Sequence, residues 1–464
     1  MLNMKYEVTE KKAAQLLGVS PARVSQLVKE KLLDAVTFNG KIRISEESIN
    51  RYQEESKRPG RPSRTSYVTA SRHTLMSGNY EIASIVYDTA LDEPLVVEEV
   101  LCPARAPLGV LTSGGKPKRR ELNDWWLHRA IPSSRPGLDS KLLSLGVTSP
   151  SNLTFRSMGL SLSDCYWLRP QEASHLTWDD VNFFENSFVE CAQDGWDSWL
   201  SGVGLASPDN TSEGELPKKW VAGSTGERFL LKGCRTDDQR PYNEVVATAL
   251  YRRLLQPEDF IDYNLVITAD GPACRCANFL RNGEEYVPAV QVKDLGGRIR
   301  ATSNYDRFCR TAASLGMDEQ VVRTALSKMI LCDAILANTD RHWRNFGFIR
   351  DIETLELRVA PLFDTGNCLW FSKTDQEVSQ RDWAFRILPF GPNVESALAC
   401  IDDVSWFNPS ALDGFVDEAC DILSASHYAT RRGRLDFIRE GLTRNIATVT
   451  SVAGVLLSRI IRGR

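Results

Sequence analysis

A polar loop between two apolar segments constrains the fold of this chain more than any other feature. Residues 338–347 read NTDRHWRNFG, and they follow residues 319–337, whose apolar side chains recur at helical spacing. The pair Phe348-Ile349 comes next and predicts a short strand. Because two buried elements hold such a loop rigidly, its polar side chains are well placed to form a site. The sequence therefore predicts a mixed α and β unit with its functional groups at residues 338–347.

The groups that phosphoryl transfer needs lie on this loop and on the segment after it. Asp340 and Asn345 have the spacing of the catalytic aspartate and the metal-binding asparagine in protein kinases. The apolar run 359–363 then ends at Asp364, in an Asp-x-Gly turn where a second metal ligand is expected. Oxygen atoms of Asp and Asn suit Mg²⁺, a hard cation that retains water. The sequence thus predicts Asp340 as the catalytic residue, with Asn345 and Asp364 as magnesium ligands.

Residues upstream of this loop predict a nucleotide site. Lys232 ends an apolar strand at residues 228–232, and Glu244 lies at the start of the next helix. A lysine on a strand and a glutamate on the following helix form the phosphate-anchoring ion pair of kinases. A loop at residues 211–220 is expected over the phosphates, and a connection between two lobes is expected at residues 289–294, where backbone groups would meet adenine. The nucleotide-binding residues expected from this arrangement are Lys232, Glu244, Gly214, Lys218, Val292 and Asp294.

The first part of the chain, residues 6–55, predicts a helix, a short turn, a second helix, a hairpin and a third helix. Thr9 and Ser20 are expected N-caps, and Asn39-Gly40 between alternating residues is a strong hairpin signal. This order resembles the winged helix-turn-helix of excisionase and MerR-type DNA-binding domains, in which the second helix enters the major groove. A structural or protein-binding three-helix unit is the alternative. The DNA contacts expected are Ser20, Arg23, Gln26, Lys41, Arg43 and Arg61.

Charge separates this head from the rest of the chain. Residues 1–64 hold 13 lysines and arginines against 8 aspartates and glutamates, whereas the remainder is acidic overall. A basic head on an acidic body indicates that the head alone meets nucleic acid. The stretch KRPGRPSR at residues 57–64 predicts a linker, because proline and glycine exclude a helix. Its Gly60-Arg61-Pro62 matches the core of an AT-hook, which lays arginine in a narrow minor groove, although a plain flexible linker is the preferred interpretation.

Composition excludes several classes of protein. No apolar run approaches the ~20 residues of a membrane helix, and the N-terminus lacks the apolar core of a signal peptide. We therefore expect a cytoplasmic protein of the bacterial cytosol or nucleoid. The 11 cysteines are odd in number and scattered, which favours reduced thiols over a disulfide scaffold or a zinc site. Residues 65–200 predict strands at 81–87 and 95–100 but show no catalytic constellation, so we expect an accessory subdomain there.

The catalytic segment resembles a known group of enzymes. Asp340-Arg341-His342-x-x-Asn345 is similar to the loop shared by phosphoinositide 3/4-kinases and HipA-like serine/threonine kinases. Further segments favour the HipA-like side and extend the resemblance over about residues 70–440: Thr211-x-x-Gly214-x-x-x-Lys218, Lys232, Leu362-Phe363-Asp364, residues 125–135 and residues 161–167.

This resemblance implies an α+β, bilobal protein-kinase-like fold with a mostly helical C-terminal lobe. It also implies ATP and Mg²⁺ as cofactors, Asp340 as catalytic base, and autophosphorylation at Thr211 or the adjacent Ser212. One departure is Glu215, an acidic residue where the family loop is usually small or amide-bearing. Another is the helix-turn-helix on the same chain, because HipA kinases commonly act as toxins with a separate helix-turn-helix antitoxin.

The domain boundaries expected are a winged helix-turn-helix at 1–56, a basic linker at 57–66, an accessory subdomain at 67–200, a kinase N-lobe at 201–295 and a C-lobe at 296–464. The expected function is a serine/threonine kinase with a protein substrate, tethered to DNA and either regulatory or toxin-antitoxin-like, with a homodimer as one option for its assembly. Two alternatives stay open: a DNA-binding regulator with an ATP-sensing pseudokinase, which Glu215 favours, and a lipid or small-molecule kinase.

Overall fold

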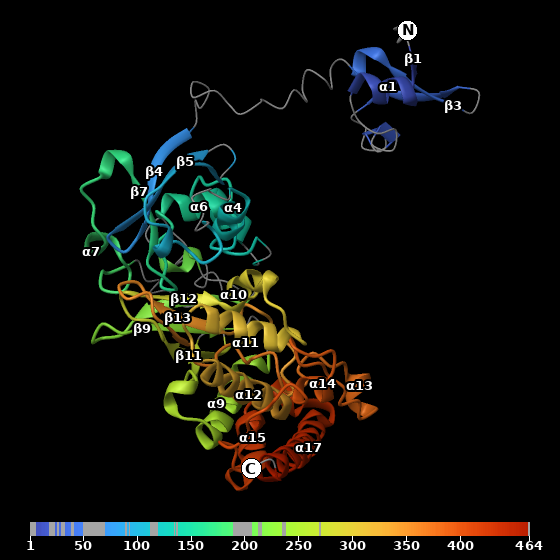
Figure 1. The fold of residues 1–464 in the computed structure, drawn as a ribbon. Helices are drawn as coiled ribbons and strands as arrows, with labels where there is room; N and C mark the ends of the chain where they lie inside the picture. Colours follow the sequence, from blue (N-terminus) through green and yellow to red (C-terminus); the bar gives the residue numbers. More distant parts are fainter. Residues whose placement is uncertain are drawn as a thin grey trace. The chain divides into compact units, whose positions relative to one another are not determined.

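The structure is a computed structural model, and the chain in it divides into two units, Met1–Val68 and Thr69–Arg464 (Figure 1). The described residues are 6–17, 24–25, 27–28, 33–38, 41–49, 70–88, 91, 93–111, 119–133, 135, 138–188, 207–211, 216–233, 238–268 and 271–462.

The N-terminal unit has a three-stranded antiparallel sheet in the order β1-β3-β2, with helix α1 following β1. Thr9 caps this helix, since its hydroxyl accepts a hydrogen bond from the amide of Lys12 at 3.3 Å. Phe38 lies opposite Lys41, so the hairpin has a two-residue loop, as the sequence predicts. Strand β1 was not predicted. The elements are β1 (Tyr6–Thr9), α1 (Glu10–Leu17), β2 (Ala35–Phe38) and β3 (Lys41–Ser45).

Apolar residues from several of the described segments of this first unit share one small core. They come from β1, β3 and α1, from helical residues at 24–25 and 27–28, which fall in the predicted second helix, and from positions 33 and 49. The core residues are Val8, Ala13, Ala14, Val24, Leu27, Leu33, Ile44 and Ile49.

The second unit begins with a four-stranded antiparallel sheet in the order β6-β5-β4-β7, which carries short helices (Figure 1). Strands β5 and β6 confirm the predicted strands at 81–87 and 95–100, whereas β4 and β7 were not predicted. The elements are β4 (Ala70–Ser77), β5 (Tyr80–Asp88), β6 (Glu93–Val100), α4 (Arg119–Leu127), α5 (Leu138–Ser144), α6 (Pro150–Arg156), β7 (Tyr166–Pro170) and α7 (Trp178–Val181).

A second antiparallel sheet follows, in the order β10-β11-β9-β8, and helix α9 enters between β9 and β10 in the chain. Strand β9 confirms the predicted strand at 228–232, and α9 confirms the predicted helix around Glu244. The elements are β8 (Lys218–Ala222), β9 (Arg228–Gly233), α9 (Arg240–Leu254), β10 (Asn264–Thr268) and β11 (Gly271–Ala277).

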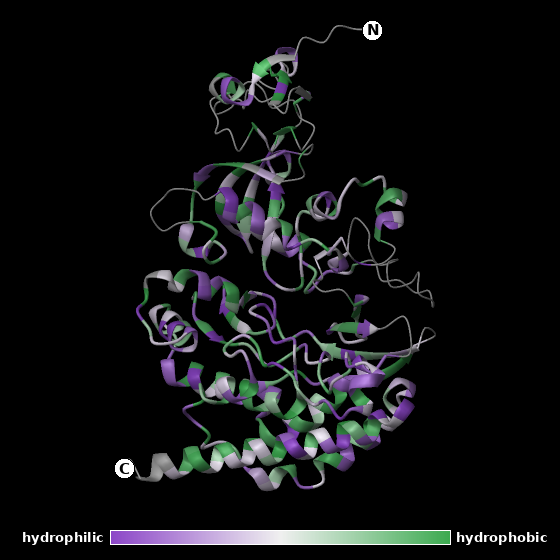
Figure 2. Ribbon diagram, turned by 90° about the vertical axis from the view of Figure 1, so that its right-hand side faces the viewer, coloured by the Kyte–Doolittle hydropathy of each residue, from purple (hydrophilic) through white to green (hydrophobic). Residues whose placement is uncertain are grey.

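The rest of the chain is mostly helical around a small sheet, β12-β13-β14. Figure 2 shows green and purple residues alternating along its helices, as expected when one helix face packs into a core. The elements are β12 (Glu284–Pro288), α10 (Ala289–Leu295), α11 (Asn304–Ser314), α12 (Glu319–Leu336), β13 (Gly347–Asp351), β14 (Leu357–Val359), α13 (Asp375–Ser379), α14 (Val394–Leu398), α15 (Phe415–Ser424), α16 (His427–Thr430) and α17 (Arg434–Arg462).

Helix α12 holds the predicted polar loop in place. Asp318 caps its first turn by accepting hydrogen bonds from Gln320 and Val321, and Ala337 ends it in a left-handed conformation with φ 52°. Most of its side chains are buried in the largest core of the molecule. Strand β13 begins directly after the loop, which confirms both flanking elements of the sequence prediction.

One predicted connection differs from the structure. Residues 289–294, expected as the connection between two lobes whose backbone groups meet adenine, belong to helix α10. Val292 is fully buried in the helical core and Asp294 is exposed beside Lys293. The chain instead leaves β11 at Ala277 and crosses to β12, so the link between the two sheets comes earlier. A short apolar run such as 289–292 does not by itself identify a helix, so the sequence did not show that this segment is helical.

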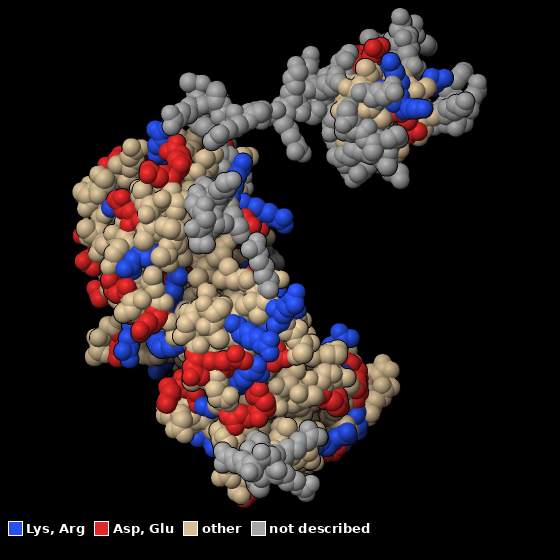
Figure 3. All heavy atoms as spheres, viewed as in Figure 1, with Lys and Arg blue, Asp and Glu red and all other residues tan. Residues whose placement is uncertain are grey.

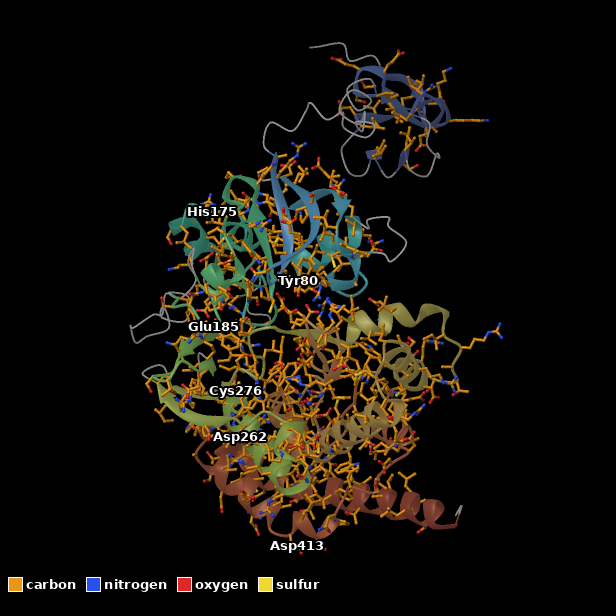
Figure 4. All side chains as sticks on the ribbon, turned by 60° about the vertical axis from the view of Figure 1, so that its left-hand side comes forward. Tyr80, His175, Glu185, Asp262, Cys276 and Asp413 are labelled. Carbon is orange, nitrogen blue, oxygen red and sulfur yellow. The ribbon has the colours of Figure 1, made fainter. Side chains whose placement is uncertain are left out.

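The first sheet of the second unit contacts the helical part directly. Tyr80, labelled in Figure 4, donates a hydrogen bond to Glu353, and the guanidinium of Arg105 lies 3.6 Å from the centre of its ring. Beneath this contact, buried Arg350 donates to Glu285 and to the hydroxyl of Tyr166. Among the described residues, no helix is long and apolar enough to cross a bilayer.

Candidate nucleotide and phosphotransfer site

Lys232 is the centre of the candidate site. It lies on β9, is buried, and its Nζ is 3.0 Å from Glu244 Oε1 on α9 and 2.7 Å from Asp364 Oδ1. The hydroxyl of Tyr263 completes the cluster at 3.0 Å from the same nitrogen. The structure therefore brings together three residues that the sequence predicted from separate segments, and it adds Tyr263.

Opposite charges hold this cluster in its ionised form. Burial disfavours the charge on Lys232, but the carboxylates of Asp364 and Glu244 outweigh it and raise the lysine pKa well above its ordinary value. Burial would raise the pKa of Asp364, yet the ammonium groups of Lys232 and Lys218 hold that pKa far below its usual range. The ammonium group of Lys232 is already paired with the carboxylates of Glu244 and Asp364. We therefore expect an anion that binds here to bring a cation of its own.

Lys218 faces the same place from the neighbouring strand. It lies opposite Lys232 in the β8–β9 pair, so both side chains emerge on one face of the sheet. Its side chain is largely buried, and its charge acts on Asp364. The structure thus places this predicted phosphate-binding lysine beside the cluster.

The polar loop after α12 holds Asp340 and Asn345 in a fixed relation. The amide nitrogen of Asn345 donates to the backbone oxygen of Asp340 at 3.0 Å. The backbone amide of Asp340 donates to the side chain of Asn338 at 3.1 Å, and Asn338 in turn bonds Asp333 of α12. These bonds anchor the loop to a buried helix, so the Asp340 carboxylate projects from a rigid base.

Arg341 joins the loop to the Asp364 turn, a role that the sequence reasoning missed. It is fully buried and pairs with Asp333 at 2.9 and 3.0 Å. It also donates to the backbone oxygens of Asn345 and Phe363 and to the hydroxyl of Thr365. Burial acts to lower its pKa, but Asp333 raises the pKa above the ordinary arginine value. An arginine directly after the predicted catalytic aspartate was the available signal.

Asn367 is a second residue that the sequence did not single out. Its side-chain nitrogen donates to Asp340 Oδ2 at 2.5 Å, and its backbone oxygen accepts from Thr339. It follows the Asp-Thr-Gly turn, in which Asp364 has a left-handed φ of 57°. That conformation turns the chain back on itself and brings Asn367 to the loop at residues 338–347.

A cleft lies beside the Lys232 cluster. It is lined by Lys232, Glu244, Asp364, Gly366 and Asn367, together with residues of β9, β11, α9 and the segment before β8: Leu216, Gly233, Arg240, Pro241 and Cys274. Cys276, labelled in Figure 4, belongs to the same strand as Cys274 and packs with it against Tyr263. Burial raises the pKa of the Cys276 thiol to about 11, so this cysteine stays protonated at neutral pH.

The predicted magnesium ligands have suitable chemistry. Asn345 uses its amide nitrogen on Asp340, which leaves its amide oxygen for a cation. The lowered pKa of Asp364 keeps its carboxylate ionised. Arg341 links the two ligand segments, because it donates to the backbone oxygens of Asn345 and of Phe363, the residue before Asp364. Among the described residues, no group of three His, Cys, Asp or Glu side chains could form an all-protein metal site. Two oxygen ligands with water fit Mg²⁺ better than zinc.

The predicted autophosphorylation residue Thr211 is held away from solvent. It ends the short helix η3 (Pro208–Thr211), and its hydroxyl donates to the backbone oxygens of Leu160 and Pro208 at 3.3 and 3.2 Å. The neighbouring predicted residues Ser212 and Gly214 lie outside the described residues, as does Glu215.

The predicted DNA contacts are described only in part. Arg43 is half-buried on β3, the central strand of the first unit's sheet. Lys41 begins the same strand, but its side chain lies outside the description. Ser20, Arg23, Gln26 and Arg61 also lie outside the described residues. Figure 3 shows acidic and basic side chains interspersed on the visible face of the second unit.

Comparisons with known proteins agree with both parts of this description. Residues 8–57 match the family described as helix-turn-helix domain. A stretch of 65 residues is 35% identical to the serine/threonine-protein kinase CtkA of Helicobacter pylori, and it spans 14% of this chain and 20% of that kinase.

Solved structures give more distant matches. A crystal structure of the H. pylori proinflammatory kinase CtkA aligns with 52% of this chain and 92% of its own length, at 15% identity and a TM-score of 0.41. A structure of the open conformation of CtTel1 aligns at 13% identity and a TM-score of 0.26, over 52% of this chain and 11% of that one. The chain thus carries an N-terminal helix-turn-helix domain and a region similar in sequence to the HipA-like kinase CtkA.

Proposed function

We propose that this chain is an ATP- and Mg²⁺-dependent serine/threonine protein kinase tethered to DNA by its own helix-turn-helix. The observation that carries the proposal is the bonding of Lys232 to Glu244 of α9 and to Asp364, in a cleft also lined by Asn367, whose side chain bonds Asp340. A strand lysine paired with a helix glutamate, next to the turn that carries a metal-binding aspartate, is the arrangement with which kinases hold ATP. The local identity to CtkA supports the same activity.

Each residue has a definite task in this proposal. Lys232 neutralises phosphate oxygens, and Glu244 keeps its ammonium group in place. Mg²⁺, held by Asn345 and Asp364, would screen the charge of the phosphates and orient them. Asp340 accepts the proton of the incoming serine or threonine hydroxyl, and the hydrogen bond from Asn367 aims its carboxylate. Arg341 keeps Asp340 and Asp364 at a constant separation by bonding both of their segments.

Autophosphorylation is part of the proposal, with Ser212 as the acceptor that we expect. Thr211 is less suited in the described conformation, because phosphorylating it requires breaking its bonds to Leu160 and Pro208 and exposing it. Tethering to DNA through residues 6–64 would place the kinase near partners that assemble on the same DNA. A toxin-antitoxin-like or a regulatory role fits this arrangement equally.

The test is phosphate transfer from γ-labelled ATP with Mg²⁺, using the full chain and dephosphorylated casein as a general acceptor. Wild-type chain should label casein, itself, or both, and Asp340→Asn should abolish label while its thermal unfolding stays unchanged. Mass spectrometry should place the self-label on Ser212. An Asp340→Asn chain as active as the wild type would contradict the proposed role.

The same experiment separates the alternatives. A wild-type chain that binds ATP but labels nothing would indicate the DNA-binding regulator with a pseudokinase, which the acidic Glu215 in the expected phosphate loop favours. Label on phosphoinositide vesicles but not on casein would indicate a lipid kinase.

A further inference from the structure

A second cation lines the candidate cleft beside Lys232, and the proposed function gives it no task. Arg240 is the first residue of α9, and it borders the cleft together with Lys232, Asp364 and Asn367. About a quarter of its side chain is exposed, 26%. Lys232 donates hydrogen bonds to Glu244, Asp364 and Tyr263, and Arg240 borders the same cleft.

The structure holds Arg240 by one edge only. Asp238 Oδ2 accepts from its Nε at 2.7 Å and from its Nη2, and Asp238 Oδ1 accepts from its backbone amide at 2.9 Å. The ring of Phe371 lies 5.0 Å from the guanidinium carbon. Among the described residues, Nη1 of Arg240 has no hydrogen-bond partner. A guanidinium fixed on one edge and open on the other is prepared to bind an anion.

The position of Arg240 selects which part of a nucleotide it meets. Its backbone oxygen would lie 3.4 Å from a Cβ added at Gly366, so α9 begins directly against the turn that follows Asp364. Asn367, one residue beyond, bonds the carboxylate of Asp340 at 2.5 Å. Arg240 therefore lies beside the turn that reaches Asp340, where the proposed function has the phosphoryl group pass to its acceptor.

We propose that Arg240 binds the terminal phosphate of the nucleotide and stabilises the charge of the phosphoryl group during transfer, with Asp238 as the residue that positions it. This inference rests on the proposed function. Donors that are already oriented toward developing charge need no reorganisation in the transition state, which is how such groups accelerate phosphoryl transfer.

The test compares nucleotide affinities by calorimetry, using the full chain with Mg²⁺ and either ATP or ADP. Arg240→Gln should lose roughly 10- to 100-fold in affinity for ATP, the range for a charge-assisted hydrogen bond, and little for ADP. Its kcat should fall at least as far. Arg252→Gln is the matched control, because Arg252 is on the same helix and pairs with Asp262 outside the cleft. That control should bind both nucleotides like the wild type.

The outcomes are distinguishable. A selective loss for ATP in Arg240→Gln alone would establish the contact. Equal losses for ATP and ADP, or none, would overturn the inference about Arg240 while the proposed kinase function stands. A wild-type chain that binds neither nucleotide would overturn the proposed function and this inference with it.

Discussion

Arg341 shows how one residue can organise a site without touching a substrate. Its guanidinium is buried and bonds Asp333, the catalytic loop and the turn after Phe363. We expect Arg341→Met to lower the free energy of unfolding by about 3–5 kcal/mol, because it leaves the Asp333 carboxylate buried without its partner. Urea unfolding would measure this. Arg310→Met, on the exposed surface of α11, should change stability by less than about 0.5 kcal/mol. A loss below about 1 kcal/mol for Arg341→Met would contradict the buried pair.

Asp209 makes a prediction about pH. It lies in η3, accepts a hydrogen bond from the amide of Trp220 at 2.7 Å, and faces the charges of Arg135 and Lys219. Burial nevertheless raises the pKa of Asp209 to about 7. A carboxyl with a raised pKa binds more protons in the folded chain than in the unfolded chain. Its stabilising contribution is therefore complete below about pH 4 and is lost as the pH rises through about 7.

We expect Asp209→Asn to remove this titration. As the pH rises from 4 to 8, the free energy of unfolding should fall less in the variant than in the wild type. The difference between the two falls should reach up to roughly 4 kcal/mol. Urea unfolding at a series of pH values would show it. Two profiles that differ only by a constant offset would contradict the raised pKa.

At the scale of elements, Gly347 is where the catalytic loop enters β13. A Cβ at this position would lie 2.2 Å from the backbone oxygen of Val287 on β12, so the two strands must separate to accept any side chain. Gly347→Ala should therefore destabilise the protein by about 2–4 kcal/mol and reduce phosphate transfer, since β13 anchors the loop. Gly454→Ala is the opposite control. A Cβ there meets nothing within 4 Å in the interior of α17, so it should stabilise by about 0.5–1 kcal/mol. Thermal unfolding of both variants would check the pair, and equal stabilities would contradict it.

Elements with a strong local signal were predictable. Helix α12 has a capping aspartate and a continuous apolar pattern, and the β2–β3 hairpin has Asn-Gly in its loop. Strand β1 and strands β4 and β7 were missed, because their stability comes from pairing with distant strands and not from their own pattern. Helix α10 was expected as a connection between lobes, because its short apolar run does not by itself identify a helix.

The candidate site divides in the same way. Lys232, Glu244 and Asp364, which the structure brings together, could be named from the sequence, as could Asp340 and Asn345, because their order along the chain matches that of the residues used in phosphoryl transfer. The supporting residues Arg341, Asn367 and Tyr263 were not, because their importance lies in bonds across long stretches of sequence.

At the scale of the whole molecule, the chain combines a helix-turn-helix domain with a second unit that carries the candidate kinase site. If residues 6–64 bind DNA mainly through phosphates, counterions are released on binding and affinity must fall steeply with salt. For four phosphate contacts, we expect the dissociation constant of the full chain to rise about 100-fold between 50 and 200 mM salt. Fluorescence anisotropy with labelled duplex DNA would measure the slope.

A matched pair of variants assigns this binding to the first unit. Arg43→Gln should weaken DNA binding, because it removes one expected phosphate-binding charge from β3. The slope of the logarithm of affinity against the logarithm of salt concentration should decrease by the share of about one phosphate contact. Arg310→Gln removes an exposed charge from the acidic second unit and should leave both unchanged. Binding that does not depend on salt would contradict recognition through phosphates. If Arg310→Gln weakened binding as much as Arg43→Gln, the second unit would share the DNA surface, and the charge separation along the sequence would have been misread.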